Sequence, residues 1–117
     1  MIPLFLYGTL LDRRILARRS GDSRLPRRMR PAALHDHARV FFRGTPYPTL
    51  VRQPGGRVEG ALIRPTPAAL AALRHYEGAT YRLIPVCVQA RQGWRRARAW
   101  MVPQRLAADL EWPPARA

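Results

Sequence analysis

The chain contains no lysine and no asparagine, and its 117 residues include one cysteine, Cys87. A single cysteine excludes an intramolecular disulfide and any metal site built from several thiolates. Val86 and Val88 flank Cys87, and this apolar context predicts a small buried strand residue rather than an activated nucleophile. We therefore do not expect cysteine chemistry to carry the function.

Long hydrophobic segments are also missing. The segment MIPLFLYGTLLD at residues 1–12 has an apolar run of roughly ten residues, whereas a membrane-spanning helix needs about 20. No basic segment precedes this run and no small-residue cleavage site follows it, so it does not resemble a signal peptide. We expect a cytoplasmic protein that does not span a membrane.

Acidic residues are scarce. Seven Asp and Glu stand against 21 basic residues, all of them arginine, and the formal net charge is +14. Such an excess suggests nucleic-acid binding, which would require the arginines to gather on one face. In the sequence they are scattered in ones and twos from Arg13 to Arg116. We expect a solvated arginine surface and no nucleic-acid partner, with nucleic-acid association as an alternative.

What the chain does have is a hydrophobic content of 47% spread along its length. A chain of 117 residues fits one domain with one core. We therefore expect residues 1–117 to form a single domain. No feature of the sequence specifies its oligomeric state.

Turn residues divide the apolar segments into predicted helices and strands. Helices are predicted at residues 11–19, with Asp12 or Thr9 as the N-cap, and at 67–76, where Thr66, Pro67 and Gly78 mark the ends. Strands are predicted at 2–7, 38–42, 47–51, 57–63, 80–90 and 94–102. Residues 20–31 are predicted to form a loop, residues 44–46, 54–56 and 91–93 turns, and the residues after 102 a polar, proline-rich tail.

The resulting order is strand, helix, three strands, helix, two strands, which is neither a regular βαβ alternation nor all-β. It predicts the α+β class. We expect a small, mostly antiparallel sheet, curled or closed into a barrel, with two helices packed on it.

Glu77 differs from the other six carboxylates, whose positions at caps, in loops, near the terminus and at a strand entrance fit a solvent-facing role. Leu70, Leu73 and Glu77 are separated by three and four residues, so they share the helix face that must be buried. Burial destabilises the charged form of a carboxyl group and raises its pKa toward the range useful for proton transfer. Glu77 is thus a candidate general acid/base. The alternative is a helix-end glutamate that pairs with an arginine at the surface.

The segment YGTL at residues 7–10 supplies a second candidate. A strand that stops at a glycine leaves several backbone N–H groups unpaired, and Gly8 permits close approach of another group. The backbone of Gly8, Thr9 and Leu10 is therefore a candidate concave site for an anion or a carbonyl oxygen. A plain turn that joins the strand to the helix is the alternative.

The three histidines raise the question of a metal site. His35 and His37 would point the same way on a strand, but no third ligand lies nearby at a suitable spacing, and zinc sites usually need three or four ligands. The chain also lacks a serine-centred nucleophile motif, a phosphate-binding glycine loop and a dinucleotide fingerprint. We therefore expect no metal ion and no cofactor.

Four segments in order resemble the γ-glutamylcyclotransferase-like superfamily, and most closely its AIG2-like and γ-glutamylamine cyclotransferase branch. They are YGTL at 7–10, GTPYPTLV at 44–51, VEG at 58–60 and YEGATYR at 76–82. The resemblance covers residues 2 to 102. It implies a small β-barrel with flanking helices and a cavity at one end of the barrel.

The same resemblance implies an enzyme that releases 5-oxoproline from a γ-glutamyl amine or a γ-glutamyl peptide. In this reaction the α-amino group of the substrate attacks its own γ-carbonyl carbon and expels an amine, without a metal or an organic cofactor. Glu77 matches the acid/base glutamate of the family. The turn whose backbone binds the γ-glutamyl portion of the substrate matches Tyr7, Gly8, Thr9 and Leu10, and Tyr81 matches a tyrosine that lines the same cavity.

The chain departs from the family pattern at three positions. Arg74 stands where aspartate is common, Leu83 where a second arginine is common, and Val102 near the position of a tyrosine in the terminal strand. These departures concern the identity of the substrate more than the fold. A non-catalytic module that binds a small acidic metabolite is therefore the alternative hypothesis.

Overall fold

The computed structural model of the protein describes residues 2–113. Its strands are β1 (Leu4–Leu6), β2 (Arg30–Phe42), β3 (Pro48–Ile63), β4 (Arg82–Ala90), β5 (Gly93–Met101) and β6 (Ala107–Glu111). Its helices are α1 (Arg13–Ser20) and α2 (Pro67–Glu77), with short 3-10 turns η1 (Thr9–Leu11), η2 (Leu25–Arg28) and η3 (Gln104–Leu106).

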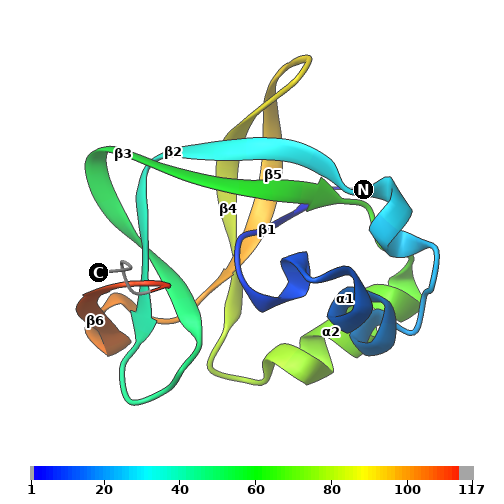
Figure 1. Cartoon of the computed structure of the whole chain (residues 1–117), viewed down its shortest axis with the longest axis horizontal. Coiled ribbons are helices and arrows are strands. Elements are labelled where there is room, and N and C mark those ends of the chain that lie inside the picture. The colour runs from blue at the N-terminus through cyan, green and yellow to red at the C-terminus, as the bar shows by residue number, and fades with distance from the viewer. Residues whose placement is uncertain (1, 114–117) are drawn as a thin grey trace.

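Five of the strands close into a barrel (Figure 1). They are hydrogen-bonded in the order β3, β1, β5, β4, β2, and β2 pairs again with β3, so these five strands leave no free edge between them. Every one of these pairs is antiparallel except β1 with β5. Helices α1 and α2 lie together on one side of the barrel. The predicted mostly antiparallel barrel with two helices is confirmed.

Helix α2 begins and ends at the residues that the sequence marks, whereas α1 begins two residues later and ends one residue later than the predicted range of 11–19. The Asp12 carboxylate caps α1 by accepting hydrogen bonds from the backbone N–H groups of Arg14 (2.9 Å) and Ile15 (3.2 Å). The Thr66 hydroxyl caps α2 by accepting from the Ala69 N–H group (3.1 Å). The φ angle of 83° at Gly78 ends α2. Helix α2 is one residue longer than the predicted helix at residues 67–76, and the additional residue is Glu77.

Strands β2 and β3 are longer than predicted, and two sequence interpretations are wrong here. Residues 30 and 31, at the end of the predicted loop, already belong to β2, and residues 54–56 continue β3 instead of forming a turn between two strands. A shift of register between His35 and His37 accommodates the Pro-Gly-Gly segment, because Asp36 adopts a φ angle of 59°. Its carboxylate then accepts a hydrogen bond from the Gly55 N–H group (2.9 Å).

The segment predicted to be a tail contains the short strand β6. This strand pairs with β2 outside the barrel, with Val40 opposite Glu111 and Phe42 opposite Ala107. The Trp112 indole adds a hydrogen bond to the Pro46 carbonyl (2.9 Å). Residues 114–117 of the predicted tail lie outside the described residues.

The interpretation of Cys87 as a buried residue is also wrong. Cys87 is exposed on β4, while its neighbours Val86 and Val88 contribute to the interior of the barrel. The side chains of a strand alternate between the two faces of the sheet, and only the inner face of β4 is covered at this position. The apolar run around Cys87 therefore does not indicate burial on both faces.

The core has two parts that meet at β1. The barrel interior contains Phe5, Tyr7, Ala32, Leu34, Leu50, Val58, Leu62, Val88, Ala97 and Ala99. The layer between the barrel and the helices contains Leu4, Leu6, Leu10, Leu16, Leu25, Ile63, Leu73 and Trp100. Successive residues of β1 contribute to opposite layers. This central strand therefore fixes where the chain that follows it, beginning at Tyr7, leaves the barrel.

No helix within residues 2–113 is both long and apolar enough to cross a membrane. The longer α-helix, α2, has 11 residues.

Candidate active site

A cavity of about 160 Å³ opens where β1 leaves the barrel, beside the end of α2 and the start of β4. It is lined by Phe5, Leu6, Tyr7, Gly8, Thr9, Leu10, Tyr47, Pro48, Tyr76, Glu77, Tyr81 and Trp100. All six of the site residues that the sequence predicted are among them. The structure thus brings together three segments that are far apart in the sequence.

Glu77 is the last residue of α2 and lines this cavity. The residue is half-buried, and burial raises the pKa of its carboxyl group to about 7. Within residues 2–113 the carboxyl group makes no hydrogen bond and no ion pair. The alternative interpretation of Glu77 as the partner of a surface arginine is therefore wrong for the described part of the chain. The carboxyl group is available to a molecule in the cavity.

The turn after β1 presents its backbone to the same cavity. Its first hydrogen bond runs from the Leu11 N–H group to the Gly8 carbonyl (3.0 Å), and the next from Asp12 to the Thr9 carbonyl (3.1 Å). The N–H groups of Gly8, Thr9 and Leu10 precede these bonds, so in the described chain they donate to no carbonyl of the turn. A Cβ atom on Gly8 would lie 2.6 Å from Cγ of Pro48. Only glycine permits this contact without a shift of Pro48.

Two tyrosines form part of the cavity wall and are held by hydrogen bonds to carbonyl groups. The buried Tyr7 hydroxyl donates to the Trp100 carbonyl. The Tyr81 hydroxyl donates to the Pro48 carbonyl (2.7 Å), and the Tyr81 ring meets the Phe42 ring edge-on at 5.7 Å. Burial raises the pKa of both hydroxyl groups, and the negative charge of Glu77 raises it further. Both side chains are therefore neutral hydrogen-bonding groups at physiological pH.

Several cavity residues were not predicted from the sequence, among them Tyr47, Pro48 and Tyr76. The Tyr76 hydroxyl lies 3.4 Å from the Thr9 hydroxyl, and the Arg19 guanidinium stacks over the Tyr76 ring at 4.9 Å. Pro48 is the first residue of β3 and Tyr47 precedes it, and both reach the cavity only because the barrel closes. All three residues belong to the YEGATYR and GTPYPTLV motifs, so the sequence contained a signal for them, but it did not indicate that they line the cavity.

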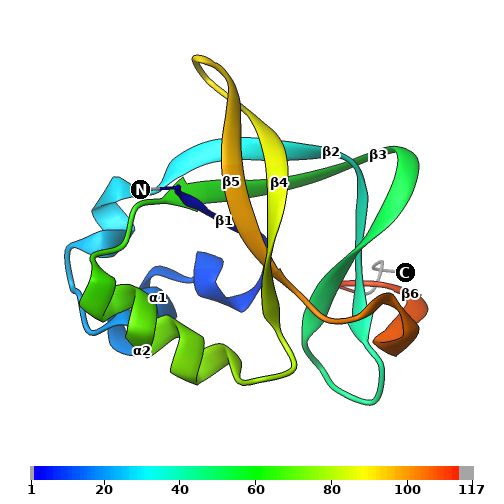
Figure 2. The ribbon, with the colours of Figure 1, turned by 180° about the vertical axis from the view of Figure 1, so that it is seen from behind.

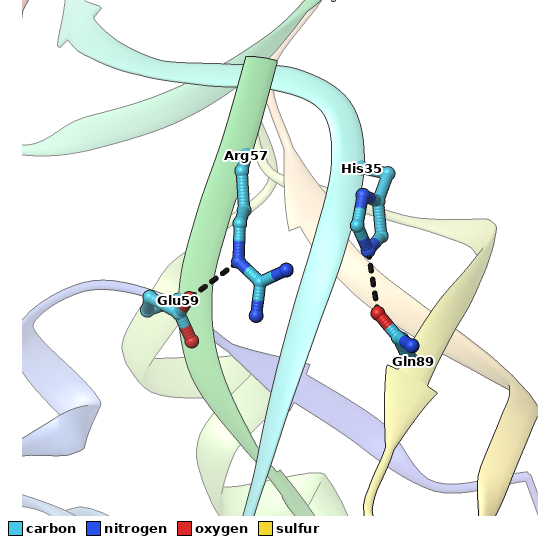
Figure 3. A network of polar contacts seen from close by, with 4 residues as sticks. All are labelled: His35, Arg57, Glu59 and Gln89. Carbon is cyan, nitrogen blue, oxygen red and sulfur yellow. Dashed lines mark hydrogen bonds and ion pairs between the residues drawn. The ribbon is translucent and has the colours of Figure 1, made fainter. Parts of the chain in front are cut away.

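Other candidate polar residues have partners away from the cavity (Figure 3). Glu59 forms an exposed ion pair with Arg57 (2.6 Å). Nε2 of His35 lies 2.8 Å from the Gln89 side-chain oxygen, and Nδ1 of His37 lies 2.9 Å from the His35 carbonyl. Across residues 2–113 no three His, Cys, Asp or Glu side chains are placed to hold a metal ion.

The three departures from the family pattern lie beside the cavity and not in its lining. Arg74 and Leu83 line a neighbouring hollow of about 560 Å³, which shares Tyr81 and Trp100 with the cavity. Val102 is buried, and its N–H group donates to the Thr49 hydroxyl (3.1 Å). Nine of the twelve residues that line the cavity belong to the motifs, and none of the three departures lines it.

Comparison with known proteins gives a family and several structural neighbours. The model of the family described as γ-glutamyl cyclotransferase, AIG2-like, matches residues 4–115. No curated protein matches the chain. The Arabidopsis thaliana protein At3g28950.1 is 25% identical, with a TM-score of 0.72 over 86% of this chain and 61% of its own. YkqA from Bacillus subtilis is also 25% identical, with a TM-score of 0.75 over 97% of this chain and 44% of its own.

A γ-glutamyl cyclotransferase of known structure is 21% identical, with a TM-score of 0.73 over 87% of this chain and 66% of its own, and this similarity shows likeness of fold alone. The chain thus spans less than two thirds of the length of At3g28950.1 and less than half that of YkqA. The family match covers nearly the whole chain, and the barrel and the cavity agree with it. The protein belongs to the AIG2-like γ-glutamyl cyclotransferase family.

Proposed function

We propose that the protein is a γ-glutamyl cyclotransferase that releases 5-oxoproline from a γ-glutamyl amine or a γ-glutamyl peptide. One observation carries the proposal: a half-buried carboxyl group without a partner in the described chain lines the same cavity as three backbone N–H groups that, within residues 2–113, donate to no carbonyl of their own turn. The family match supports a reaction of this class. Glu77 is the proposed acid/base residue, and the segment from Tyr7 to Leu10, with Tyr81, is the proposed substrate-binding wall.

The reaction suits a site with few functional groups. The attacking α-amino nitrogen and the γ-carbonyl carbon belong to one molecule, so closing the five-membered lactam requires only that the cavity hold the folded conformer. Holding two reacting groups in this way can lower the activation free energy by about 7 kcal/mol or more in well-oriented cases. The new C–N bond forms the ring, and the original amide C–N bond breaks to free an amine.

Proton transfer is the step that needs a side chain. The substrate amine must lose a proton as it attacks, and the departing nitrogen must gain one before it leaves as an amine. A carboxyl group with a pKa of about 7 does both at neutral pH, because it accepts and returns a proton with little cost in either direction. Glu77 would take the proton from the α-amino group as a carboxylate and deliver it to the leaving nitrogen as the acid.

The turn after β1 supplies the charge stabilisation. Attack on the γ-carbonyl group places negative charge on its oxygen, and the substrate also carries an α-carboxylate. N–H groups of Gly8, Thr9 and Leu10 that donate to no carbonyl of their own turn are suited to bind either group without rearrangement. Tyr7 and Tyr81 are fixed by their bonds to carbonyl groups and would keep the substrate in its folded conformer.

A panel of γ-glutamyl compounds tests the proposal. The protein is incubated with γ-glutamyl alkylamines, γ-glutamyl amino acids and γ-glutamyl dipeptides, and 5-oxoproline and the freed amine are measured by mass spectrometry. We expect at least one compound to yield the two products in equal amounts. Binding measured by calorimetry without product from any member would instead favour the non-catalytic module, and neither binding nor product would remove both hypotheses.

A further inference from the structure

A third concavity, a hollow of about 520 Å³, lies at the end of the barrel opposite the candidate active site. Its lining comes from Pro3 before β1, the start of β2, the end of β3 and the β4–β5 hairpin. The active-site cavity takes its lining from the other ends of these strands, including Leu6 of β1 and Trp100 of β5. Figures 1 and 2 show the tip of the β4–β5 hairpin projecting beyond the barrel at this end. The two sites are therefore separate.

Arginine dominates this hollow. Five of its ten lining residues are arginines, and they come from three separate segments of the chain: Arg28 and Arg30, then Arg64, then Arg91 and Arg95. None of the ten is aspartate or glutamate. The scattered sequence positions gave no sign of this grouping, because only the closure of the barrel brings residues 28–30 and 64 next to the hairpin. We refer to this feature as the arginine hollow.

Two of the guanidinium groups are held in place by the backbone. Nη1 of Arg30 donates to the carbonyl groups of Arg27 (3.4 Å) and Met29 (3.1 Å), and Nη1 of Arg95 donates to the Trp94 carbonyl (2.9 Å). Arg28 and Arg91 are exposed and make no hydrogen bond or ion pair within residues 2–113. Like charges gathered around one concavity repel one another, and an anion that enters the concavity removes this repulsion. The hollow therefore combines pre-oriented donors with donors that are available to a ligand.

We propose that the arginine hollow binds a compact anion that carries several phosphate groups. A phosphate group has about −1.5 to −2 charge at neutral pH and several acceptor oxygens, and the planar guanidinium group matches this geometry with two parallel N–H donors. Five guanidinium groups around one hollow fit two or more linked phosphates better than a single carboxylate. The arginines enclose a concavity instead of forming a stripe, so the ligand is a compact polyphosphate or nucleotide and not an extended nucleic-acid strand.

Inorganic tripolyphosphate is the probe that tests this proposal, measured by isothermal titration calorimetry in phosphate-free buffer. The test variant is R28Q/R91Q, since neither side chain makes a hydrogen bond or an ion pair within the described residues and the fold does not need them. The matched control is R14Q/R105Q, which removes the same charge from exposed arginines that do not line the hollow. We expect saturable binding by the unmodified protein, a loss of about 30-fold or more in affinity in R28Q/R91Q, and less than about threefold in the control.

Titration with ATP and with a single-stranded oligonucleotide distinguishes the possible sources of the phosphates. If ATP binds and R28Q/R91Q weakens this binding as it weakens tripolyphosphate binding, the ligand is a nucleotide. If tripolyphosphate binds and ATP does not, the ligand is an inorganic polyphosphate. The proposal is overturned if tripolyphosphate does not bind. It is also overturned if R28Q/R91Q and R14Q/R105Q lower the affinity for tripolyphosphate by the same factor, because the net charge of the protein alone would then attract the anion. Oligonucleotide binding much tighter than that of tripolyphosphate would also overturn it, in favour of a nucleic-acid surface.

Discussion

Replacing Glu77 by glutamine is expected to lower the rate of 5-oxoproline release by about 100- to 10,000-fold, the range typical for loss of a general acid/base group. Glutamine keeps the shape of the side chain and removes its ability to accept and return a proton. The carboxyl group makes no hydrogen bond or ion pair within residues 2–113, so replacing it by an amide breaks no such contact of the fold. The variant should therefore fold and bind the substrate while turning it over very slowly.

Glu59→Gln is the matched control for this experiment. Glu59 is an exposed glutamate on β3 whose partner, Arg57, lies outside the cavity lining. The control should keep turnover within about twofold, because surface substitutions of this kind change little. Turnover by Glu77→Gln equal to that of the unmodified protein would exclude Glu77 as the acid/base residue, while the reaction itself could still be correct.

The second large effect concerns folding stability and pH. The pKa of the Glu77 carboxyl group is about 7 in the folded protein, compared with an ordinary value of 4.5 for a glutamate in the unfolded chain. The unfolded chain therefore loses the carboxyl proton first as the pH rises. Below about pH 4.5 both states hold the proton and Glu77 contributes no difference. Between about pH 4.5 and 7 the free energy of unfolding falls, and above pH 7 the total loss from this group reaches about 3 kcal/mol.

Glu77→Gln removes this dependence, and urea unfolding at pH 5 and pH 8.5 measures it. At pH 5 the variant and the unmodified protein should differ by less than about 1 kcal/mol from this source, and at pH 8.5 the variant should be more stable by about 2–3 kcal/mol. Glu59→Gln should follow the unmodified protein at both pH values. A difference between Glu77→Gln and the unmodified protein that does not change with pH would show that burial does not disfavour the charged carboxyl group.

Local signals made the helices predictable from the sequence. Asp12 and Thr66 cap the helices, and Gly78 ends the second one, and each acts on residues within one turn of itself. The β4–β5 hairpin was predictable for the same reason, since its strands are neighbours in the sequence. These elements need no knowledge of the rest of the fold.

The full length of β2 and β3 was not predictable from local signals. A Pro-Gly-Gly segment normally marks a turn, and here it continues a strand because Asp36 on the partner strand adopts a positive φ angle and binds Gly55. Strand β6 depends on pairing with residues more than 60 positions earlier in the chain. Exposure of Cys87 likewise depends on which face of the barrel wall is covered.

In the candidate site, too, local features were predictable from the sequence and features that depend on closure of the barrel were not. Helical spacing was enough to single out Glu77, and the glycine after β1 was enough to single out the turn. The contact between Gly8 and Pro48, the bond from Tyr81 to the Pro48 carbonyl and the position of Tyr47 all arise from closure of the barrel. The candidate residues were thus visible in the sequence, and the shape of the cavity was not.

The central claim is that the half-buried carboxyl group of Glu77 moves the proton in lactam formation. The pH dependence of kcat/KM for 5-oxoproline release, measured from pH 5 to pH 8 with a substrate found in the panel, tests this claim most directly. The carboxylate form of Glu77 starts the reaction, so kcat/KM should fall about tenfold per pH unit below a pKa of about 7. A kcat/KM that stays constant between pH 5 and pH 7 would contradict the claim.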